Sequence, residues 1–343
     1  MNKILAFGAT GPFAGLVLPE LAKRKAEVRA FVRNPDDAPR VRRNGATEIA
    51  LGDLTDADSV QRALEGITSI FYVSPVFLAG QAAIGQRVVA QAVEAGVKRF
   101  VFSSLIHPVL SGLPNHASKA PVEEAVLDSN LEFTFLHPAI LFQNYARTWA
   151  GILESGVVIE PWSNEIRHSR VDYRDVAEVA AIALTEDRLV NGTFELCAEE
   201  TLNRHEIAAL IGEITGRTIE ARRGDEAMLK RFPEVLWPMF EHYDHYGLRG
   251  NPLTLRAIRL RRTAAHACVL RLGYLRAIAD RWSDSCSDVR GGSIVGCSPL
   301  FCSGWREWNR TTDPYRVKVP VGRFDGYPVV SPVKQHIAFQ TLE

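Results

Sequence analysis

Long apolar runs are missing from this chain of 343 residues, and so is any cysteine arrangement that would shape a fold. No stretch reaches the ~18 apolar residues that a membrane-spanning helix needs, and the opening residues MNKILAFG read as a strand rather than a signal peptide. The five cysteines are too few for a disulfide framework, and no pair has the spacing of zinc ligands. We therefore expect a cytoplasmic protein with no bound metal and no membrane partner.

An excess of charge of one sign is also lacking, because 40 Lys and Arg residues balance 40 Asp and Glu residues. The balance is uneven along the chain: 14 basic and 7 acidic residues lie from Arg256 onward, which leaves 26 and 33 in residues 1–255. An acidic main body argues against a protein that grips nucleic acid over its whole surface. We do not expect nucleic acid as a partner of this part of the chain.

Strand-like and helix-like segments alternate over residues 1–140, which is typical of a parallel sheet covered on both faces. The expected strands are Lys3–Gly8, Glu27–Val32, Thr47–Leu51, Thr68–Ser74, Arg99–Ser104 and Glu132–Leu136, and the expected helices are Phe13–Lys25, Ala57–Leu64, Gln81–Ala95 and Ser118–Asp128. Right-handed crossovers between such strands give a doubly wound α/β sheet, whose ligand lies at the carboxyl ends of the strands.

The pattern changes after Pro138 and predicts a smaller α/β lobe over residues 141–258, which completes the fold and holds the substrate. Its expected elements are a helix near Leu141–Leu153, a strand at Val157–Ile159, a helix at Arg174–Leu184, a strand at Gly192–Cys197 and a helix at Asn203–Thr215.

Residues 259–343 differ in kind from the rest of the chain. Arg256–Trp282 holds seven arginines and a single acid, Asp280, and Ser283–Glu343 has no helical or alternating pattern. Three interpretations stay open: a basic arm that binds a partner or nucleic acid, an irregular lobe of the native protein, and a frame-shifted or read-through extension. The abrupt change in composition favours the last, an atypical tail that is non-native or disordered.

The most informative motif is the glycine loop Gly8-Ala-Thr-Gly11, between the first expected strand and the first expected helix. Glycines at this junction let backbone N–H groups approach a phosphate, which the N-terminus of a helix also attracts. The third glycine of the usual spacing is replaced by Ala14, which close packing tolerates. The alternative is an ordinary turn between strand and helix. We assign the pyrophosphate of a dinucleotide to Gly8, Thr10, Gly11, Pro12 and Phe13.

Arg33 follows the second expected strand, where the adenine ribose of a dinucleotide lies. Arginine pairs with a 2′-phosphate, whereas a carboxylate would accept from a 2′-hydroxyl, so we expect NADP(H) in preference to NAD(H), with NAD(H) still possible. After the third strand, Asp53 is placed to accept from the adenine amino group, with Leu54 against the ring. The alternatives are a solvated Arg33, and an Asp53 that only organises its turn while Thr55 caps the next helix.

Further candidates follow the fourth and fifth strands. Ser74 ends the fourth strand, where it could contact the ribose or simply stop the strand. Lys119, at the head of a helix, can hold the nicotinamide ribose through its ammonium group or lie on the helix surface. His107 and His116 could relay protons near neutral pH, or each could cap a turn or sit in the lobe interface. No Ser–His–Asp arrangement appears, so hydrolysis is a poor interpretation.

Together these residues make the chain similar to the NmrA-like family of atypical short-chain dehydrogenase/reductase proteins, which have an NAD(P)-binding Rossmann fold. The resemblance runs from Met1 to about Ile258. It implies NADP(H) binding at the glycine loop, Arg33, Asp53 and Lys119. It also implies a substrate cleft near Pro138, Phe142 and Tyr145, and we count His107 among the substrate residues as well. The motifs that carry it are Gly8-Ala-Thr-Gly11, Arg33-Asn-Pro35, Gly52-Asp-Leu-Thr55, Val101-Phe-Ser-Ser104, Lys119 with Val122-Glu-Glu124, His137-Pro138 with Asn144, Val171-Asp-Tyr-Arg-Asp-Val176 and Asn191-Gly-Thr-Phe-Glu-Leu196.

The wider superfamily donates a proton from a tyrosine four residues before the lysine, and here that position is Asn115, which cannot ionise. We expect an oxidoreductase, similar to the quinone reductases of the family, that passes hydride to a small planar acceptor held against Phe142 and Tyr145. Lys119 and His116 are its candidate catalytic residues, with the proton coming from His116 or from water. The alternative is a redox sensor that binds both forms of the cofactor and regulates a protein partner without chemistry.

Overall fold

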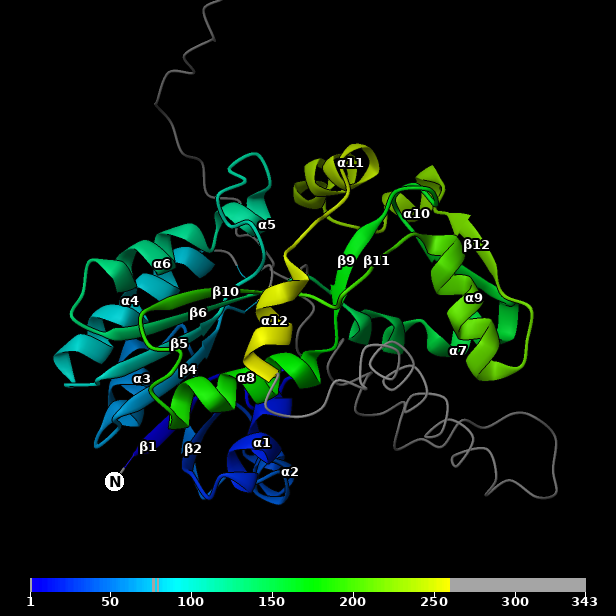
Figure 1. Ribbon diagram of the computed structural model, residues 1–343. Coiled ribbons are helices and arrows are strands. Elements are labelled where there is room, and N and C mark those ends of the chain that lie inside the picture. Colours follow the sequence, from blue (N-terminus) through cyan, green and yellow to red (C-terminus); the bar gives the residue numbers. More distant parts are fainter. Residues whose placement is uncertain (1, 76–77, 79, 260–343) are drawn as a thin grey trace, which may run out of the picture. The chain divides into compact units, whose positions relative to one another are not determined.

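The computed structural model describes residues 2–75, 78 and 80–259 (Figure 1). The expectations for the tail beyond Arg259 lie outside the described residues. Within the described part of the chain, none of the helices combines the length and the apolar character needed to cross a membrane.

The core of the fold is a parallel sheet of seven strands, in the order β10-β6-β5-β4-β1-β2-β3. This confirms the doubly wound α/β architecture and all six strands predicted before residue 140. The strand predicted at Gly192–Cys197 also forms, and it pairs with β6 at the edge of this same sheet. The strands are β1 (Lys3–Ala6), β2 (Glu27–Val32), β3 (Glu48–Leu51), β4 (Ser69–Val73), β5 (Arg99–Ser103), β6 (Glu132–Pro138) and β10 (Gly192–Leu196).

Helices cover both faces of the sheet, as a parallel sheet requires (Figure 1). One face packs against α1 (Val17–Lys23), α8 (Tyr173–Thr185) and α12 (Pro252–Arg259). The other packs against α3 (Ala57–Leu64), α4 (Gln81–Glu94) and α6 (Ala120–Leu127). Two short helices, α2 (Ala38–Arg43) and α5 (Pro114–Ala117), lie in connections that the sequence pattern did not mark as helical.

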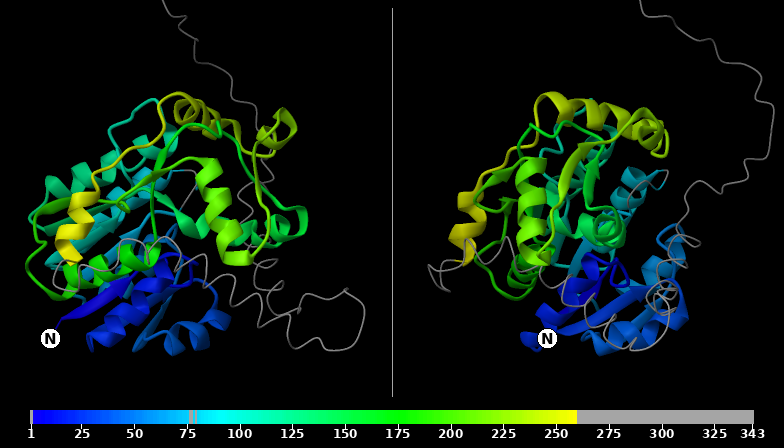
Figure 2. Two further views of the ribbon diagram at one scale, coloured as in Figure 1. Left: turned by 45° about the vertical axis from the view of Figure 1, so that its right-hand side comes forward. Right: turned by 90° about the vertical axis from the view of Figure 1, so that its right-hand side faces the viewer.

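The smaller part of the fold contains two small sheets with four helices (Figure 2). One sheet has the order β11-β9-β7, and β12 pairs with β8 in the other. The helix α9 packs against β12 and β8. The elements are β7 (Ile140–Leu141), β8 (Val157–Glu160), β9 (His168–Val171), β11 (Thr201–Leu202), β12 (Glu220–Arg223), α7 (Trp149–Ser155), α9 (Arg204–Thr215), α10 (Glu226–Leu229) and α11 (Trp237–His245).

The segment after residue 140 is divided between the two parts of the fold. Its elements α8, β10 and α12 belong to the large sheet and its covering helices, and the other elements form the smaller part. The single helix expected near Leu141–Leu153 is wrong in its bounds: a 3₁₀ segment spans Phe142–Arg147, and α7 begins only after Thr148. The side chain of Gln143 bonds both Asp172 and the backbone of Tyr173, and these contacts fix the tight first segment.

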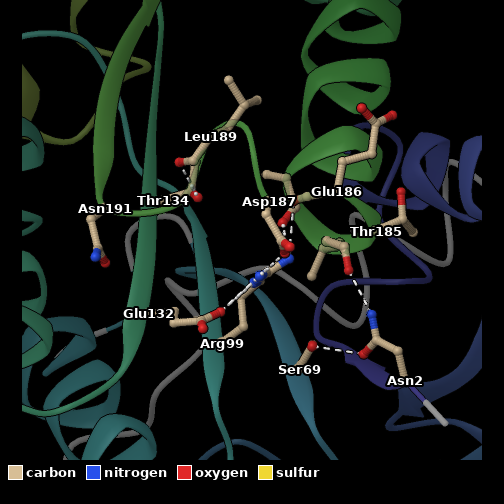
Figure 3. Close-up of polar contacts among 12 residues, drawn as sticks. Asn2, Ser69, Arg99, Glu132, Thr134, Thr185, Glu186, Asp187, Leu189 and Asn191 are labelled. Carbon is tan, nitrogen blue, oxygen red and sulfur yellow. Dashed lines mark hydrogen bonds and ion pairs between the residues drawn. The ribbon is translucent and has the colours of Figure 1, made fainter.

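Arg99 ties the start of β5 to the end of α8 (Figure 3). Its Nη1 donates to the carbonyl oxygens of Ala183 and Glu186, at 3.2 and 3.0 Å, which would otherwise lack partners at the end of the helix. Its Nε and Nη2 donate to Glu132, and Nη2 also meets Asp187 at 2.7 Å. The positive charge of the guanidinium also interacts favourably with the negative end of the helix dipole.

We predict that Arg99→Ala lowers the free energy of unfolding by roughly 2–4 kcal/mol, because it leaves the buried carbonyl group of Ala183 and the partly buried one of Glu186 without this partner. Asp187→Ala is the matched control, since that carboxylate is 94% exposed and its ion pair is screened by water. Urea unfolding measures the free energy of unfolding of both variants. Equal losses in the two variants would contradict the assignment of the stabilisation to the helix end.

Candidate functional site

The large sheet has a topological switch point between its neighbouring strands β1 and β4. From β1 the chain continues outward through β2 and β3 on one side, and from β4 it continues through β5, β6 and β10 on the other. Connections that leave in opposite directions open a crevice at the carboxyl ends of the strands, where ligands of such sheets bind. The loop after β1 and the loop after β4 therefore border the candidate site.

The glycine loop is folded tightly against the end of β4. Gly8 has a φ of +72°, and a Cβ atom there would lie only 2.5 Å from Cγ1 of Val73. The N–H of Gly11 donates to the carbonyl oxygen of Gly8 at 2.8 Å, and a Cβ on Gly11 would come within 3.1 Å of that oxygen. Both positions therefore favour glycine, as the loop of a phosphate site does.

The helix after this loop begins differently from the prediction. A 3₁₀ turn spans Ala14–Leu16, and the α-helix starts at Val17 rather than at Phe13. Ala14 stands at the third-glycine position and is buried beside Gly8. The close approach that a third glycine normally gives is made one residue later, because a Cβ on Gly15 would lie 2.8 Å from the carbonyl oxygen of Ala9.

The other loop residues contribute in different ways. Pro12 is exposed and carries no N–H, so it can shape the loop but cannot donate to a phosphate. The ring of Phe13 lies 6.0 Å from the ring of Tyr173, between their centroids, which places the start of α8 beside the loop. The carbonyl oxygen of Thr10 accepts from Nη2 of Arg40 at 3.0 Å.

Two arginines lie beyond the end of β2. Arg33 directly follows the strand and is exposed, and its charge acts on Asp53, which follows β3. Arg40, on α2, contacts the glycine loop through Thr10 and holds Asp37 at 2.6 Å. Sequence reasoning missed Arg40 because α2 carries no clear apolar period, although its three arginines over residues 40–43 were a visible signal.

Asp53 follows β3 and organises its own turn. Its Oδ1 accepts from the N–H and the hydroxyl of Thr55, at 2.8 and 2.7 Å. Burial opposes ionisation of this carboxyl, but the two bonds from Thr55 and the charge of Arg33 outweigh it and hold the pKa of Asp53 below its usual value. The idea that Thr55 caps α3 is wrong: Asp56 is the cap, and its side chain accepts from Asp58 N. Leu54 is partly buried against the α3/α4 side of the sheet.

Lys119 is buried rather than placed on a helix surface, which excludes the surface alternative. It precedes α6, is only 4% exposed, and its Nζ donates to Oε1 of Gln81 at 2.7 Å. Desolvation lowers the pKa of Lys119 to about 8. An amine with this pKa changes protonation state close to neutral pH, which is a frequent property of functional lysines. Ser74, at the end of β4, is buried as well.

Two adjacent serines at the end of β5 send their side chains to opposite faces of the sheet. Ser103 shares a hydrogen bond of 2.9 Å with the hydroxyl of Tyr173, on the α8 side. Ser104 donates to Oε1 of Glu123 at 2.5 Å, on the α6 side, and the same oxygen lies 2.9 Å from Nε2 of His137. Tyr173, Glu123 and His137 were not predicted as site residues, since their partners are far away in sequence.

The two histidines predicted as proton relays differ in their surroundings. His116 is 2% exposed, with Nδ1 at 3.2 Å from the carbonyl oxygen of His107 and Nε2 at 3.0 Å from the hydroxyl of Tyr243. A carbonyl only accepts, so Nδ1 carries the proton and Nε2 accepts from Tyr243. Burial lowers the pKa of His116 to about 4, so the ring is neutral at pH 7. These contacts favour the interior role over the proton relay.

His107 is partly exposed and has a φ of +54°, an uncommon backbone conformation for a residue with a side chain. Its Nε2 lies 3.5 Å from Oε1 of Glu195 on β10. The carbonyl oxygen of His107 is held by His116 and by the N–H of Leu110, so the surrounding structure fixes this conformation.

The structure corrects the placement of Phe142 and Tyr145 in a substrate cleft. Both are buried, at 2 and 3% exposed, in the core of the smaller part of the fold. The hydroxyl of Tyr145 donates to Glu160, and its ring lies 5.3 Å from the guanidinium carbon of Arg170. Their side chains are therefore committed to packing. Pro138 ends β6 and is buried, and its carbonyl accepts from Ile106 N.

Comparison with known proteins identifies the family of this chain. The profile of the NmrA-like family matches residues 1–254. The chain belongs to the NmrA-like family. This confirms the resemblance inferred from the motifs, and the match ends close to the point where we expected the resemblance to stop.

Characterised relatives of this chain include two bacterial reductases. The chain is 30% identical to an NAD(P)H azoreductase of Xenophilus azovorans over 221 residues, which cover 63% of this chain and 75% of that protein. It is 26% identical to quinone oxidoreductase 2 of Escherichia coli over 64% of this chain and 77% of that protein.

Two solved structures share the fold of this chain. The NADPH complex of the Escherichia coli quinone oxidoreductase has a TM-score of 0.69 at 23% identity, covering 82% of this chain and all of that one. A Citrobacter triphenylmethane reductase also reaches 0.69 at 21% identity, covering 81% of this chain and all of that one.

We predict that His116 and His168 make the protein less stable as the pH falls from about 6.5 to about 4, whereas Asp175, whose pKa burial raises to about 7, acts in the opposite direction. The folded state keeps His116 and His168 neutral, because burial lowers the pKa of each to about 4, whereas the unfolded chain takes up protons below pH 6.5. Each histidine accounts for a loss on the order of 3 kcal/mol over this window. Urea unfolding at a series of pH values measures this loss of stability. A slope that is the same in His116→Asn as in the original protein would contradict the assignment.

Proposed function

We propose that this chain is an NADP(H)-dependent oxidoreductase that passes hydride to a small planar acceptor such as a quinone. The observation that carries the proposal is the glycine loop at the switch point between β1 and β4, where Gly8 has no room for a side chain and a Cβ on Gly11 would crowd the carbonyl oxygen of Gly8. A loop of this form brings backbone amides to a pyrophosphate. The residues of the crevice therefore fit a dinucleotide.

The surroundings of β2 support NADP(H) over NAD(H). The strand is followed by Arg33 rather than by a carboxylate, and Arg40 adds a second guanidinium between Asp37 and the glycine loop. A guanidinium fork complements a 2′-phosphate, which a carboxylate would repel. Asp37 is already paired with Arg40, so its charge is balanced locally. NAD(H) remains a weaker second cofactor in this proposal.

The acceptor class is supported by the names of the related proteins. An azoreductase, a quinone oxidoreductase and a reductase of triphenylmethane dyes are all named for conjugated aromatic or quinoid molecules that can be reduced by a hydride equivalent. Membership of the same family makes a related acceptor the simplest expectation for this chain.

Bound NADPH supplies the hydride, and the residues of the chain hold the reactants and manage the proton. We assign Lys119 to the nicotinamide ribose, where its Nζ already has a fixed direction through Gln81. With a pKa of about 8 the ammonium form dominates at pH 7 and can also give up a proton. His116 does not take this role, because its ring is neutral and bound on both nitrogens. Asn115, at the usual tyrosine position, has no proton to give.

The redox-sensor alternative, with a regulatory protein partner, makes a different prediction from the enzyme. A sensor must bind NADP and NADPH with unequal affinity, since equal binding shifts no equilibrium. It also requires no turnover. Calorimetric titration with both forms, next to a turnover assay, separates the two functions.

We predict steady oxidation of NADPH in the presence of at least one member of a panel of quinones and azo dyes, followed at the absorbance of NADPH. Gly11→Asp is the matched control, because it brings a carboxylate to the pyrophosphate position and crowds the carbonyl of Gly8. We expect its turnover to be lower by at least about a hundredfold. A panel on which the original protein is no faster than this variant would refute the enzyme proposal.

We predict that Arg33→Ala weakens NADPH binding by roughly tenfold to a hundredfold, while NADH binding stays within about twofold, because only NADPH carries the 2′-phosphate. Calorimetry with both cofactors measures the change. Arg62→Ala, an exposed arginine in the last turn of α3, serves as the control for loss of one surface charge. Parallel losses for NADPH and NADH would contradict the assignment of Arg33.

A further inference from the structure

We propose that Glu123 is a positioning residue, which holds the first turn of α6 against the sheet and thereby fixes Lys119. The inference rests on the role of Lys119 in the proposed function. The side-chain hydrogen bonds of Glu123 go to Ser104 and His137, and its effect on the reaction acts through the lysine.

The contacts of Glu123 join three elements at one point. Its Oε1 accepts from the hydroxyl of Ser104, just past the end of β5, at 2.5 Å, and lies 2.9 Å from Nε2 of His137 in β6. Ser104 and His137 are buried, and the side chain of Glu123 is only 12% exposed. Hydrogen bonds to a carboxylate in such surroundings are short and strong, so the carboxylate fastens α6 to two neighbouring strands.

Lys119 lies one helical turn before Glu123 and is tied to it through the backbone. The carbonyl oxygen of Lys119 accepts from the N–H of Val122 at 3.0 Å and from that of Glu123 at 3.2 Å. A displacement of Glu123 therefore moves the backbone of Lys119 and breaks the alignment of Nζ with Gln81. Reacting groups lose much of their effect when they move by about 1 Å.

Glu123 acts through geometry rather than through charge. The pKa of Lys119 is lowered by desolvation, with no opposing effect of a nearby carboxylate. Ser104, Glu123 and His137 also do not form a nucleophilic triad. The serine proton is directed at Glu123, and the histidine meets the same carboxylate oxygen instead of the serine. The cluster can hold α6 in place, and the start of α6 positions the buried Lys119.

The test uses the full chain with Glu123→Ala, Glu123→Gln, Ser104→Ala and, as matched control, Glu124→Ala. Glu124 is the exposed neighbour of Glu123 on the same helix. The first readout needs no activity: the rate at which Lys119 is acetylated by acetic anhydride is measured by mass spectrometry against pH. In Glu123→Ala we expect the midpoint of this profile to rise from about 8 toward the ordinary lysine value, because the freed side chain gains water.

The second readout is kinetic. In Glu123→Ala we expect kcat to fall by about tenfold or more, while the affinity for NADPH changes by less than about threefold, since the glycine loop and Arg33 are untouched. Glu123→Gln keeps an oxygen that both partners can donate to, so it restores kcat and the acetylation profile. Ser104→Ala removes one of the two bonds and shifts both quantities in the same direction by a smaller amount.

Several outcomes overturn the proposal. One is that the acetylation profile of Glu123→Ala matches that of the control Glu124→Ala. If Glu123→Ala does not fold, the same comparison is made with Ser104→Ala. Another is a Gln variant as impaired as the Ala variant. If the original protein turns over no acceptor, the proposed function fails, but the acetylation profiles still decide the positioning role.

Discussion

Both faces of the large parallel sheet must be buried, and the helix that closes the second face comes from far along the chain. Ten of the thirteen residues of α8 are buried between the sheet and α1. Its last turn is fastened by Arg99 and by Asn2, whose side chain donates to Leu184 O at 2.7 Å. Its first turn meets the end of β5 through Tyr173 and Ser103. Together with α1 and α12, this helix buries the second face of the sheet.

The same helix links the crevice to the smaller part of the fold. Asp172 caps α8 and also accepts from Gln143, which in turn accepts from the N–H of Tyr173. The chain thus leaves the large sheet before Leu141 and returns to it at Tyr173. The hydrogen bonds of Gln143 and Asp172 hold the two ends of this segment together. The smaller part, which we expected to form the substrate cleft with Phe142 and Tyr145, instead turns those side chains into its own core. The proposed ligand residues that remain lie in the loops after the strands and at the start of α6.

Desolvation shifts the pKa of two buried groups, Lys119 and His116, with opposite consequences for their protonation near neutral pH. Lys119 and His116 are both almost fully buried, and in both cases burial lowers the pKa. The consequence differs, because a lysine at about 8 still titrates near neutral pH, whereas a histidine at about 4 stays neutral. Burial therefore leaves Lys119 able to change its protonation state near neutral pH and keeps the His116 ring neutral there. No sequence pattern separates the two cases, since each depends on the surrounding side chains.

The sequence alone determined the elements that rest on local regularities: the apolar strands, the amphipathic helices and the glycine loop, whose residues are neighbours in the chain. It also indicated the family, because the motifs that carry the resemblance are short and each consists of residues that are neighbours in the chain. Only the tertiary structure showed that β10 joins the large sheet and that α8 covers one of its faces. It also showed that Thr55 does not cap α3 and that Tyr145 is buried. It alone brought Glu123 to Ser104 and Arg40 to the glycine loop. Such contacts join residues far apart in sequence, and their geometry follows from how whole elements pack, which local spacing does not encode.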